Sequence, residues 1–319
     1  MNKIAVITSG GDSPGMNAAI RASVRVALAH KTEVWGIRNG YGGIISGDII
    51  KLDSRSVGDI IQKGGTFLGT ARSEEFRTLA GRQKAADNLK DRGIEGLVVI
   101  GGEGSLTGAK KLSELGIKFV GLPGTIDNDI WGTDYTIGFD TAVNTALDAI
   151  NKLRETASAH GRVMLVEVMG RHCGWIALTA GLAGGAEIIL IPEDPFSQDE
   201  ICEQLLASRA RGKQYSIVVI AEGAGSAIEL GKYIRGKTGL ETRASVLGHI
   251  QRGGAPTVSD RLLASRLAEA AVRALLSGKS GIMIGYRDRQ CVEVAIEDAI
   301  GLKKIVDPEL YRLAQVLAQ

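Results

Sequence analysis

Short apolar runs rich in β-branched residues recur along this chain and alternate with amphipathic stretches, and this alternation constrains the fold more than any other feature. Runs of four to six apolar residues that alternate with helices predict βαβ units around parallel sheets. The expected strands are Ile4–Ile7, Gly96–Ile100, Phe119–Leu122, Val163–Val168, Ile188–Ile191, Ser216–Ile220 and Gly281–Gly285, and the expected helices are Met16–His30, Gln83–Arg92, Ala142–Thr156, Gln198–Arg211 and Asp260–Leu276.

A chain of 319 residues is long enough for two domains, at roughly 100 to 200 residues each. We therefore predict an α/β fold with two Rossmann-like three-layer α/β/α domains and mostly parallel sheets. No Pro-rich or low-complexity linker marks a boundary between them.

The net charge of +2 gives no reason to expect a nucleic-acid or membrane partner. The three cysteines, Cys173, Cys202 and Cys291, have no CxxC or CxxH spacing, which favours a reducing cytosol over a disulfide framework or a zinc site. No apolar run approaches the roughly 20 residues that span a bilayer, and the N-terminus does not resemble a signal peptide. We expect a soluble, cytoplasmic protein.

Glycine is enriched in loops that follow expected strands. The chain has 43 glycines, about twice the ordinary ~7% share. The loops Ser9–Asn17 and Gly101–Ser105 each stand between a strand and a helix, where backbone N–H groups and the helix N-terminus favour phosphate. A plain βα turn, or a capping box at Glu103, remains the alternative. Neither loop matches the dinucleotide or P-loop signatures.

A third loop, Pro123–Asp129, carries two acids at i and i+2, Asp127 and Asp129. One carboxylate can accept a proton from an attacking hydroxyl while the other helps to bind or orient metal and substrate. An acidic turn without catalytic function is the alternative, because Asp and Asn are common in turns. The Gly and bidentate Glu of an EF-hand are missing at the required offsets.

Arginines gather at strand ends and in glycine loops, where a bidentate guanidinium would suit a phosphorylated sugar. Arg171 follows the expected strand Val163–Val168, and Arg252 lies in a loop with His249, which could instead be a core histidine. Arg21 and Arg25, one helical turn apart, would by pattern alone be a solvated surface.

Taken together and in order, four segments resemble the bacterial ATP-dependent 6-phosphofructokinase family over essentially the whole chain: Ser9–Ala18, Pro123–Asp129, Met169–Arg171 and Leu247–Gly254. The resemblance implies a homotetramer in which residues 1–138 plus 251–301 bind ATP, while 139–250 plus 302–319 bind fructose 6-phosphate and effectors. It also implies Mg²⁺, with Glu103 as the metal ligand.

For the active site, the resemblance implies that Asp127 is the base, supported by Asp129 and Thr125, and that Arg72 and Arg171 neutralise the transferred phosphoryl group. The implied ATP-binding residues are Gly11, Tyr41, Arg72, Ser73, Gly102, Glu103, Gly104, Ser105 and Gly108. The implied sugar-phosphate contacts are Thr125, Ile126, Asp127, Met169, Gly170, Arg171, Glu222, His249, Ile250, Gln251 and Arg252, with Arg162 and Arg243 coming from a neighbouring subunit.

The resemblance also implies an effector site, where ADP activates and phosphoenolpyruvate inhibits. Its residues would be Arg21, Arg25, Asp59, Arg154, Gly185, Ala186, Glu187, Arg211, Lys213, Gln214 and Tyr215. The chain departs from well-known members at Glu103, where they commonly have Asp, and at Ser54, where some members have an effector-site Arg; in this chain Arg55 lies beside Ser54. Gln214 and Tyr215 replace a more usual basic pair.

The nearest alternative is a diphosphate-dependent phosphofructokinase, in which Asp at position 104 and Lys at position 124 fill space that ATP uses. Gly104 and Gly124 favour ATP. A non-catalytic nucleotide sensor would be expected to lose the pair Asp127 and Asp129, and a nicotinamide dehydrogenase would carry GxGxxG.

Overall fold

The structure is a computed structural model that describes residues 1–318, and the chain divides into two compact units. Unit 1 comprises Met1–Ile126, Ile130–Thr141 and Arg252–Lys304. Unit 2 comprises Asp127–Asp129, Ala142–Gln251 and Ile305–Gln319.

Unit 1 is built on a seven-stranded sheet in the order β11-β10-β5-β4-β1-β2-β3. The inner pairs are parallel, and the edge strands β3 and β11 run antiparallel to their neighbours. The strands are β1 (Lys3–Ser9), β2 (Glu33–Ile37), β3 (Ile49–Leu52), β4 (Gly96–Gly101), β5 (Lys118–Pro123), β10 (Ile282–Arg287) and β11 (Gln290–Ala295).

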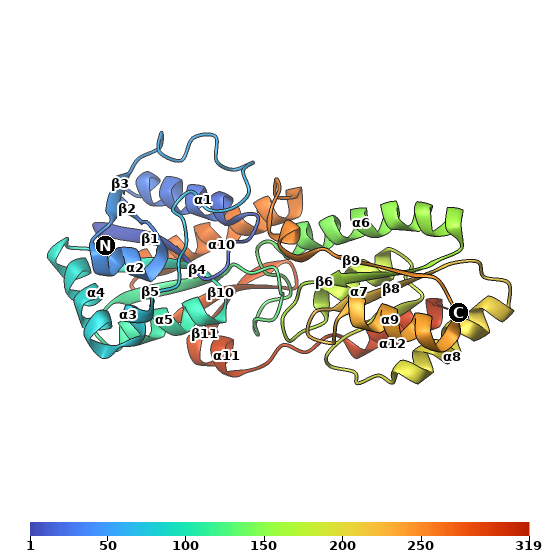
Figure 1. The fold of residues 1–319 in the computed structure, drawn as a ribbon. Helices are drawn as coiled ribbons and strands as arrows, with labels where there is room; N and C mark the ends of the chain where they lie inside the picture. The colour runs from blue at the N-terminus through green and yellow to red at the C-terminus, as the bar shows by residue number, and fades with distance from the viewer. Residues whose placement is uncertain (319) are drawn as a thin grey trace. The chain divides into compact units, whose positions relative to one another are not determined.

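Helices cover both faces of this sheet, so its central strands are apolar at successive positions. In β1, Ile4 and Val6 pack with α1 and α10, whereas Ala5 and Ile7 pack in the cluster that α2, α4 and α5 complete. Figure 1 shows α1 and α10 on one side of this sheet and α4 and α5 on the other. The helices are α1 (Met16–Ala29), α2 (Gly40–Ser46), α3 (Glu74–Arg77), α4 (Leu79–Asp91), α5 (Glu103–Ser113), α10 (Val258–Leu276) and α11 (Ile296–Gly301).

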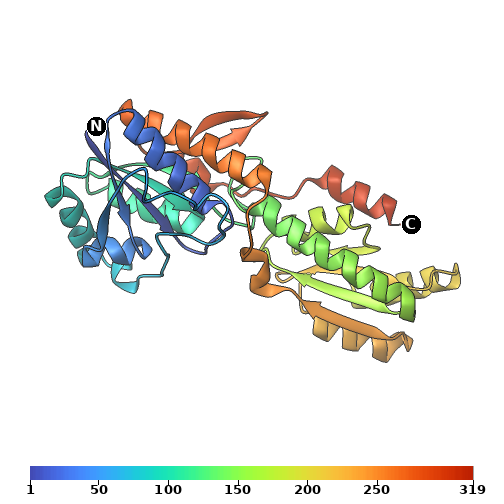
Figure 2. The same cartoon turned by 90° about the horizontal axis from the view of Figure 1, so that it is seen from above.

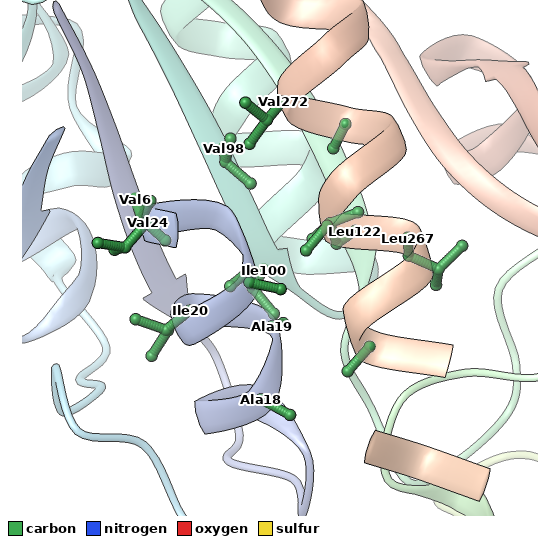
Figure 3. Packing of buried hydrophobic residues seen from close by; sticks show 14 of the residues in the cluster. Val6, Ala18, Ala19, Ile20, Val24, Val98, Ile100, Leu122, Leu267 and Val272 are labelled. Carbon is green, nitrogen blue, oxygen red and sulfur yellow. The ribbon is translucent and has the colours of Figure 1, made fainter. Parts of the chain in front are cut away.

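The α1 and α10 layer shows how the helical periodicity fits the sheet. Figure 3 shows Ile20 and Val24 of α1, with Leu267 and Val272 of α10, packed over apolar side chains of the central strands. Each such side chain contributes roughly 1.5 to 3 kcal/mol when it is removed from water. The strand side of this layer is Val6, Val98, Ile100 and Leu122.

Unit 2 has a four-stranded parallel sheet in the order β7-β8-β6-β9. Figure 2 shows two of its strands side by side, β6 in green and β9 in orange. Helices α8 and α9 pack on one face, against Leu165 and Val218. Helix α7 packs on the other face of the sheet. It lies so close that a Cβ at Gly181 would meet Ile189 and Val219. The elements are α6 (Phe139–His160, which begins in unit 1), β6 (Val163–Val168), α7 (Trp175–Ala183), β7 (Ile188–Leu190), α8 (Gln198–Ala210), β8 (Ser216–Ala221), α9 (Ala227–Thr238), β9 (Thr242–Val246), the 3-10 helix η1 (Gly248–Arg252) and α12 (Pro308–Leu317).

The predicted fold class is confirmed: both sheets are mostly parallel and are flanked by helices. Every expected strand and helix is present within a few residues of its expected bounds. One local expectation differs, because the segment expected as a loop around His249 forms η1, with Gln251 fully buried.

Candidate functional site

In unit 1, the loops after β1, β4 and β5 meet at the carboxyl edge of the sheet. The strand order reverses between β1 and β4, the place where ligands of open parallel sheets bind. Gly124 N–H donates to the Gly101 carbonyl at 3.0 Å, which joins the second and third loops. A Cβ at Gly101 would lie 2.5 Å from both the Ser9 carbonyl oxygen and Ser105 Oγ, so the chain needs glycine there.

The first loop places Gly11 under Arg252. Arg252 Nη1 donates to the Asp12 carbonyl at 3.1 Å, and a Cβ at Gly11 would collide with the guanidinium. A glycine expected to bind ATP and an arginine expected to bind sugar phosphate therefore lie together in unit 1. Their shared edge combines exposed backbone with a cation, as an anion site requires.

The second loop opens α5, and Gly102 is its N-cap residue. Glu103 follows in the first turn, where its exposed carboxylate is favoured by the helix dipole. A Cβ at Gly104 would meet nothing within 4 Å, whereas one at Gly102 would lie 3.7 Å from Thr125 Cβ. This loop is open on the side of Gly104 and adjoins Thr125 on the other.

Tyr41 lies against the same helix. Its ring stacks on Phe76 at 4.1 Å, and its hydroxyl donates to the Ser105 carbonyl at 2.5 Å. Burial raises the pKa of Tyr41. A Cβ at Gly108 would lie 2.7 Å from the ring, and Ser73 caps α3 by accepting from Phe76 N–H at 3.2 Å. The predicted ATP-binding residues Tyr41, Ser73, Ser105 and Gly108 thus form one group, whereas Arg72 is exposed beside it.

In unit 2, Asp127 is 3% exposed and lies beside Arg171, with 3.6 Å between Asp127 Oδ2 and Arg171 Nε. Arg171 stands just beyond the carboxyl end of β6, in the left-handed conformation at φ 52°. Its N–H donates to Glu222 Oε1 at 2.9 Å, which fixes the turn that presents the guanidinium.

Other predicted sugar-phosphate residues surround this pair in unit 2. Met169 N–H donates to Gln251 Oε1 at 3.4 Å, and Glu222 N–H donates to the Val168 carbonyl at 2.8 Å. His249 and Ile250 are exposed on η1, so the alternative of a core histidine is wrong. The carboxyl ends of β6 and β8 therefore gather Asp127, Met169, Gly170, Arg171, Glu222 and Gln251.

Arg162 and Arg243 lie at the opposite end of the same sheet. Both contact Glu241, Arg162 Nε at 3.0 Å and Arg243 Nη2 at 2.5 Å. Arg162 precedes β6, whereas Arg171 follows it, and a strand of six residues is roughly 17 to 20 Å long. Within one chain, these two arginines are not brought together with Arg171.

The unit 2 residues expected at the effector site form a charged cluster around Glu187. Lys213 Nζ lies 2.7 Å and Arg154 Nη1 3.9 Å from Glu187 Oε1, while Glu187 Oε2 accepts from Ile217 N–H at 2.5 Å. Arg154 also donates to the Gly185 carbonyl at 2.7 Å and lies 5.9 Å from the Tyr215 ring.

The remaining effector residues lie around this cluster or in unit 1. Arg211 donates to Ser208 Oγ at 3.2 Å, the Gln214 carbonyl accepts from Arg209, and Ala186 is buried. Arg21, Arg25 and Asp59 belong to unit 1, and Arg25 and Asp59 are exposed.

Comparison with known proteins identifies the family. The family model described as "Phosphofructokinase" matches residues 3–275. The chain is 57% identical over 319 residues to an ATP-dependent 6-phosphofructokinase of Clostridium botulinum (strain Loch Maree / Type A3), and 60% identical over 318 residues to one of Bacillus pumilus (strain SAFR-032). Each alignment covers 100% of both chains. The chain belongs to the phosphofructokinase family.

Solved phosphofructokinases share the fold. The Saccharomyces cerevisiae phosphofructokinase gives a TM-score of 0.89 at 37% identity over 100% of this chain, which spans 48% of the yeast chain. A diphosphate-dependent ("Pyrophosphate-dependent") phosphofructokinase from Marinobacter aquaeolei gives 0.86 at 26% identity, over 97% of this chain and 86% of that one. The resemblance inferred from the sequence, and the prediction that the chain is an enzyme of this kind, are confirmed.

The Mg²⁺ expected from the family can be tested against the donor set. Glu103 offers one exposed carboxylate at the start of α5, beside the open position at Gly104. Mg²⁺ at nucleotide sites needs one or two carboxylates, with phosphate and water supplying the rest. Glu103 therefore fits. Within residues 1–318, no group of three or more His, Cys, Asp or Glu side chains could hold a metal ion alone.

None of the helices among residues 1–318 combines the length and the apolar character needed to cross a bilayer.

Two buried residues of this phosphofructokinase were missed by the sequence analysis. Cys173 donates from Sγ to the Asp127 carbonyl at 3.0 Å. Asp260 accepts from Gly138 N–H and Thr141 N–H, both at 2.8 Å, at the start of α6. The Thr257–Asp260 spacing indicates a helix N-terminus, but no local pattern links Asp260 to residues 119 and 122 positions away.

Proposed function

We propose that this protein transfers the γ-phosphoryl group of ATP to the 1-hydroxyl of fructose 6-phosphate, giving fructose 1,6-bisphosphate and ADP. Relatives that align over the full length carry the name of this activity. The observation that carries the mechanism is the buried Asp127 paired with Arg171. A carboxylate can accept the proton of an attacking hydroxyl, and a guanidinium beside it favours an incoming anion.

The residues divide between nucleotide and sugar. In unit 1, the glycine loops and the group formed by Tyr41, Ser73, Ser105 and Gly108 would bind ATP. In unit 2, Glu222 and the turn at Met169–Arg171 would hold the sugar phosphate. Arg72 and Arg171 would neutralise the phosphoryl group, while Thr125 and Asp129 support Asp127. When bound at Glu103, Mg²⁺ would neutralise charge on the ATP phosphates.

ATP is favoured over diphosphate at the second loop. The space expected at Gly104 is present, since a Cβ there would meet nothing within 4 Å. Gly124 differs, because its Cβ would lie 3.0 Å from Ile100 Cγ2 and 3.2 Å from Gly101 N. A larger side chain at Gly124 would require the backbone to move. Gly104 is therefore the position that supports ATP use.

Assembly as a homotetramer would complete the sugar site. Arg162 and Arg243 lie at the amino end of the unit 2 sheet, a strand length from Arg171, so they would reach a sugar phosphate only on a neighbouring subunit. Their shared contact with Glu241 holds both guanidiniums at one place. A lone phosphate could be bound by such a pair.

We also propose that ADP activates and phosphoenolpyruvate inhibits at the cluster around Glu187. Arg154, Lys213 and Arg211 supply cations there, and Arg21, Arg25 and Asp59 would join from a neighbouring subunit. Phosphate on either effector would compete with Glu187 for Lys213. The proposed setting of this glycolytic enzyme is the cytoplasm.

The test is a coupled assay with fructose 6-phosphate in which ATP and diphosphate are compared as donors in the presence of Mg²⁺. The proposal predicts rapid turnover with ATP and little with diphosphate. The reverse ratio of rates would assign the chain to diphosphate-dependent phosphofructokinases instead.

A further inference from the structure

The three residues Asp127–Asp129 group with unit 2, although the chain on both sides of them belongs to unit 1. Ile126 and Ile130 are buried at 0% and 1% exposure, and Ile130 packs into the apolar core of unit 1. Because Asp127–Asp129 groups with unit 2, contacts within unit 2 help to hold the Asp127 carboxylate.

Two such contacts reach Asp127 from one turn of unit 2. Arg171 approaches the carboxylate at 3.6 Å, but its side chain is 53% exposed. Arg171 would also be engaged by the substrate anion in the proposed reaction, so this ion pair changes during turnover. Cys173 instead donates from Sγ to the main-chain carbonyl of Asp127 at 3.0 Å, and it is only 7% exposed.

Cys173 is itself held firmly. Its N–H donates to the Gly170 carbonyl at 3.0 Å, and the next residue, Gly174, donates to Glu193 Oε1 at 3.0 Å. Gly170 has φ 142°, and a Cβ there would collide with the Cys173 carbonyl. Burial raises the pKa of the thiol to about 12, so Sγ keeps its proton and remains a donor at neutral pH.

We propose that Cys173 is a positioning residue for Asp127: its thiol holds the Asp127 backbone and thereby fixes the carboxylate relative to Arg171. The inference rests on the proposed function, in which Asp127 is the base. One turn, Gly170–Cys173, then carries both the cation for the phosphoryl group and the anchor for the base. A small displacement of a base can cost a large part of the rate.

The test compares Cys173→Ala with Cys173→Ser in the full-length enzyme. The alanine variant removes the donor, and we expect kcat to fall roughly 3- to 30-fold with KM for ATP unchanged. The serine variant keeps an O–H donor, and its kcat should return to within about threefold of the parent. Equal losses in both variants, or no loss in either, would overturn the proposal.

Cys202→Ala is the matched control. Cys202 is another buried cysteine of unit 2, but it packs among Ile201 and Leu205 in the apolar core. The Cys202→Ala variant should be less stable than the parent but should keep its kcat. If its kcat falls as much as that of Cys173→Ala, lost packing alone explains the effect of both substitutions. If Cys173→Ala does not fold, infrared spectra of the parent and of Cys173→Ser test the hydrogen bond instead. The S–H band of Cys173 is the one that is missing from the serine variant. This band should lie at lower frequency than the other thiol bands. A band at the frequency of a free thiol would refute the hydrogen bond.

Asp127→Asn separates this inference from the proposed function. Near-normal turnover of Asp127→Asn would refute the base and with it any positioning role. Loss of turnover in Asp127→Asn, together with unaffected Cys173→Ala, would overturn the Cys173 inference alone.

Discussion

Asp260 allows a quantitative prediction about pH and stability. Its carboxylate is 1% exposed and accepts from Gly138 N–H, Thr141 N–H and the Thr141 hydroxyl at the start of α6, where backbone N–H groups have no acceptor within the helix itself. Burial raises the pKa of Asp260 to about 6 from an ordinary 3.8, although the hydrogen bonds from Thr141 and Gly138 act in the opposite direction. Desolvation thus outweighs three hydrogen bonds.

The sign of the effect follows from linkage. The folded pKa lies above the unfolded one, so the folded state holds the proton more tightly. The contribution of Asp260 to stability is therefore fully present below about pH 4 and is lost as pH rises through about 6. Asp260→Asn cannot titrate. The stability of the parent relative to this variant should fall by roughly 2 kcal/mol between about pH 4.5 and about pH 7.

Urea unfolding of the parent and Asp260→Asn at both pH values, at one protein concentration, measures this difference. The comparison cancels the titration of every group that the two proteins share. A difference that does not change with pH would refute the raised pKa. If the stability of the parent relative to Asp260→Asn rises with pH, the hydrogen bonds lower the pKa of Asp260 by more than burial raises it.

Three further predictions concern ligands. Gly108→Ala should raise KM for ATP about tenfold or more, because its Cβ would press on the Tyr41 ring; an unchanged KM would remove this group from the ATP site. Gly104→Asp should lower turnover with ATP through repulsion of its phosphates, whereas Gly104→Ala, which fits the open space, should not; equal effects would contradict the charge argument. Arg211→Ala should reduce the ratio of rates with and without ADP, and an unchanged ratio would exclude Arg211 from effector binding.

The sequence predicted the parallel core because its strands are buried on both faces. Val163–Val168 is a continuous apolar run apart from Glu167, and the structure forms β6 over the same residues. The strands that were not predicted are β2, β3, β9 and β11, and all of these except β2 lie at the edge of a sheet. In β11 (Gln290–Ala295) only Val294 is buried, so the segment is not a buried apolar run, and its antiparallel pairing with β10 was not predicted.

The candidate site divides in a similar way. A run of glycines between a strand and a helix can be recognised from the local sequence. Gly11, Gly102 and Gly104 could be selected for that reason. Cys173 could not, because its partner is a main-chain carbonyl 46 residues away and no cysteine spacing marks it. Long-range contacts to backbone groups leave no trace in residue type.

In the proposed mechanism, Asp127 is the group that takes the proton of the sugar hydroxyl. Asp127→Asn keeps the size of the side chain and removes the basic carboxylate, so steady-state kinetics with fructose 6-phosphate and ATP test the role directly. We predict a kcat lower by roughly 10²- to 10⁴-fold with ATP affinity retained. A kcat close to that of the parent enzyme would contradict the mechanism.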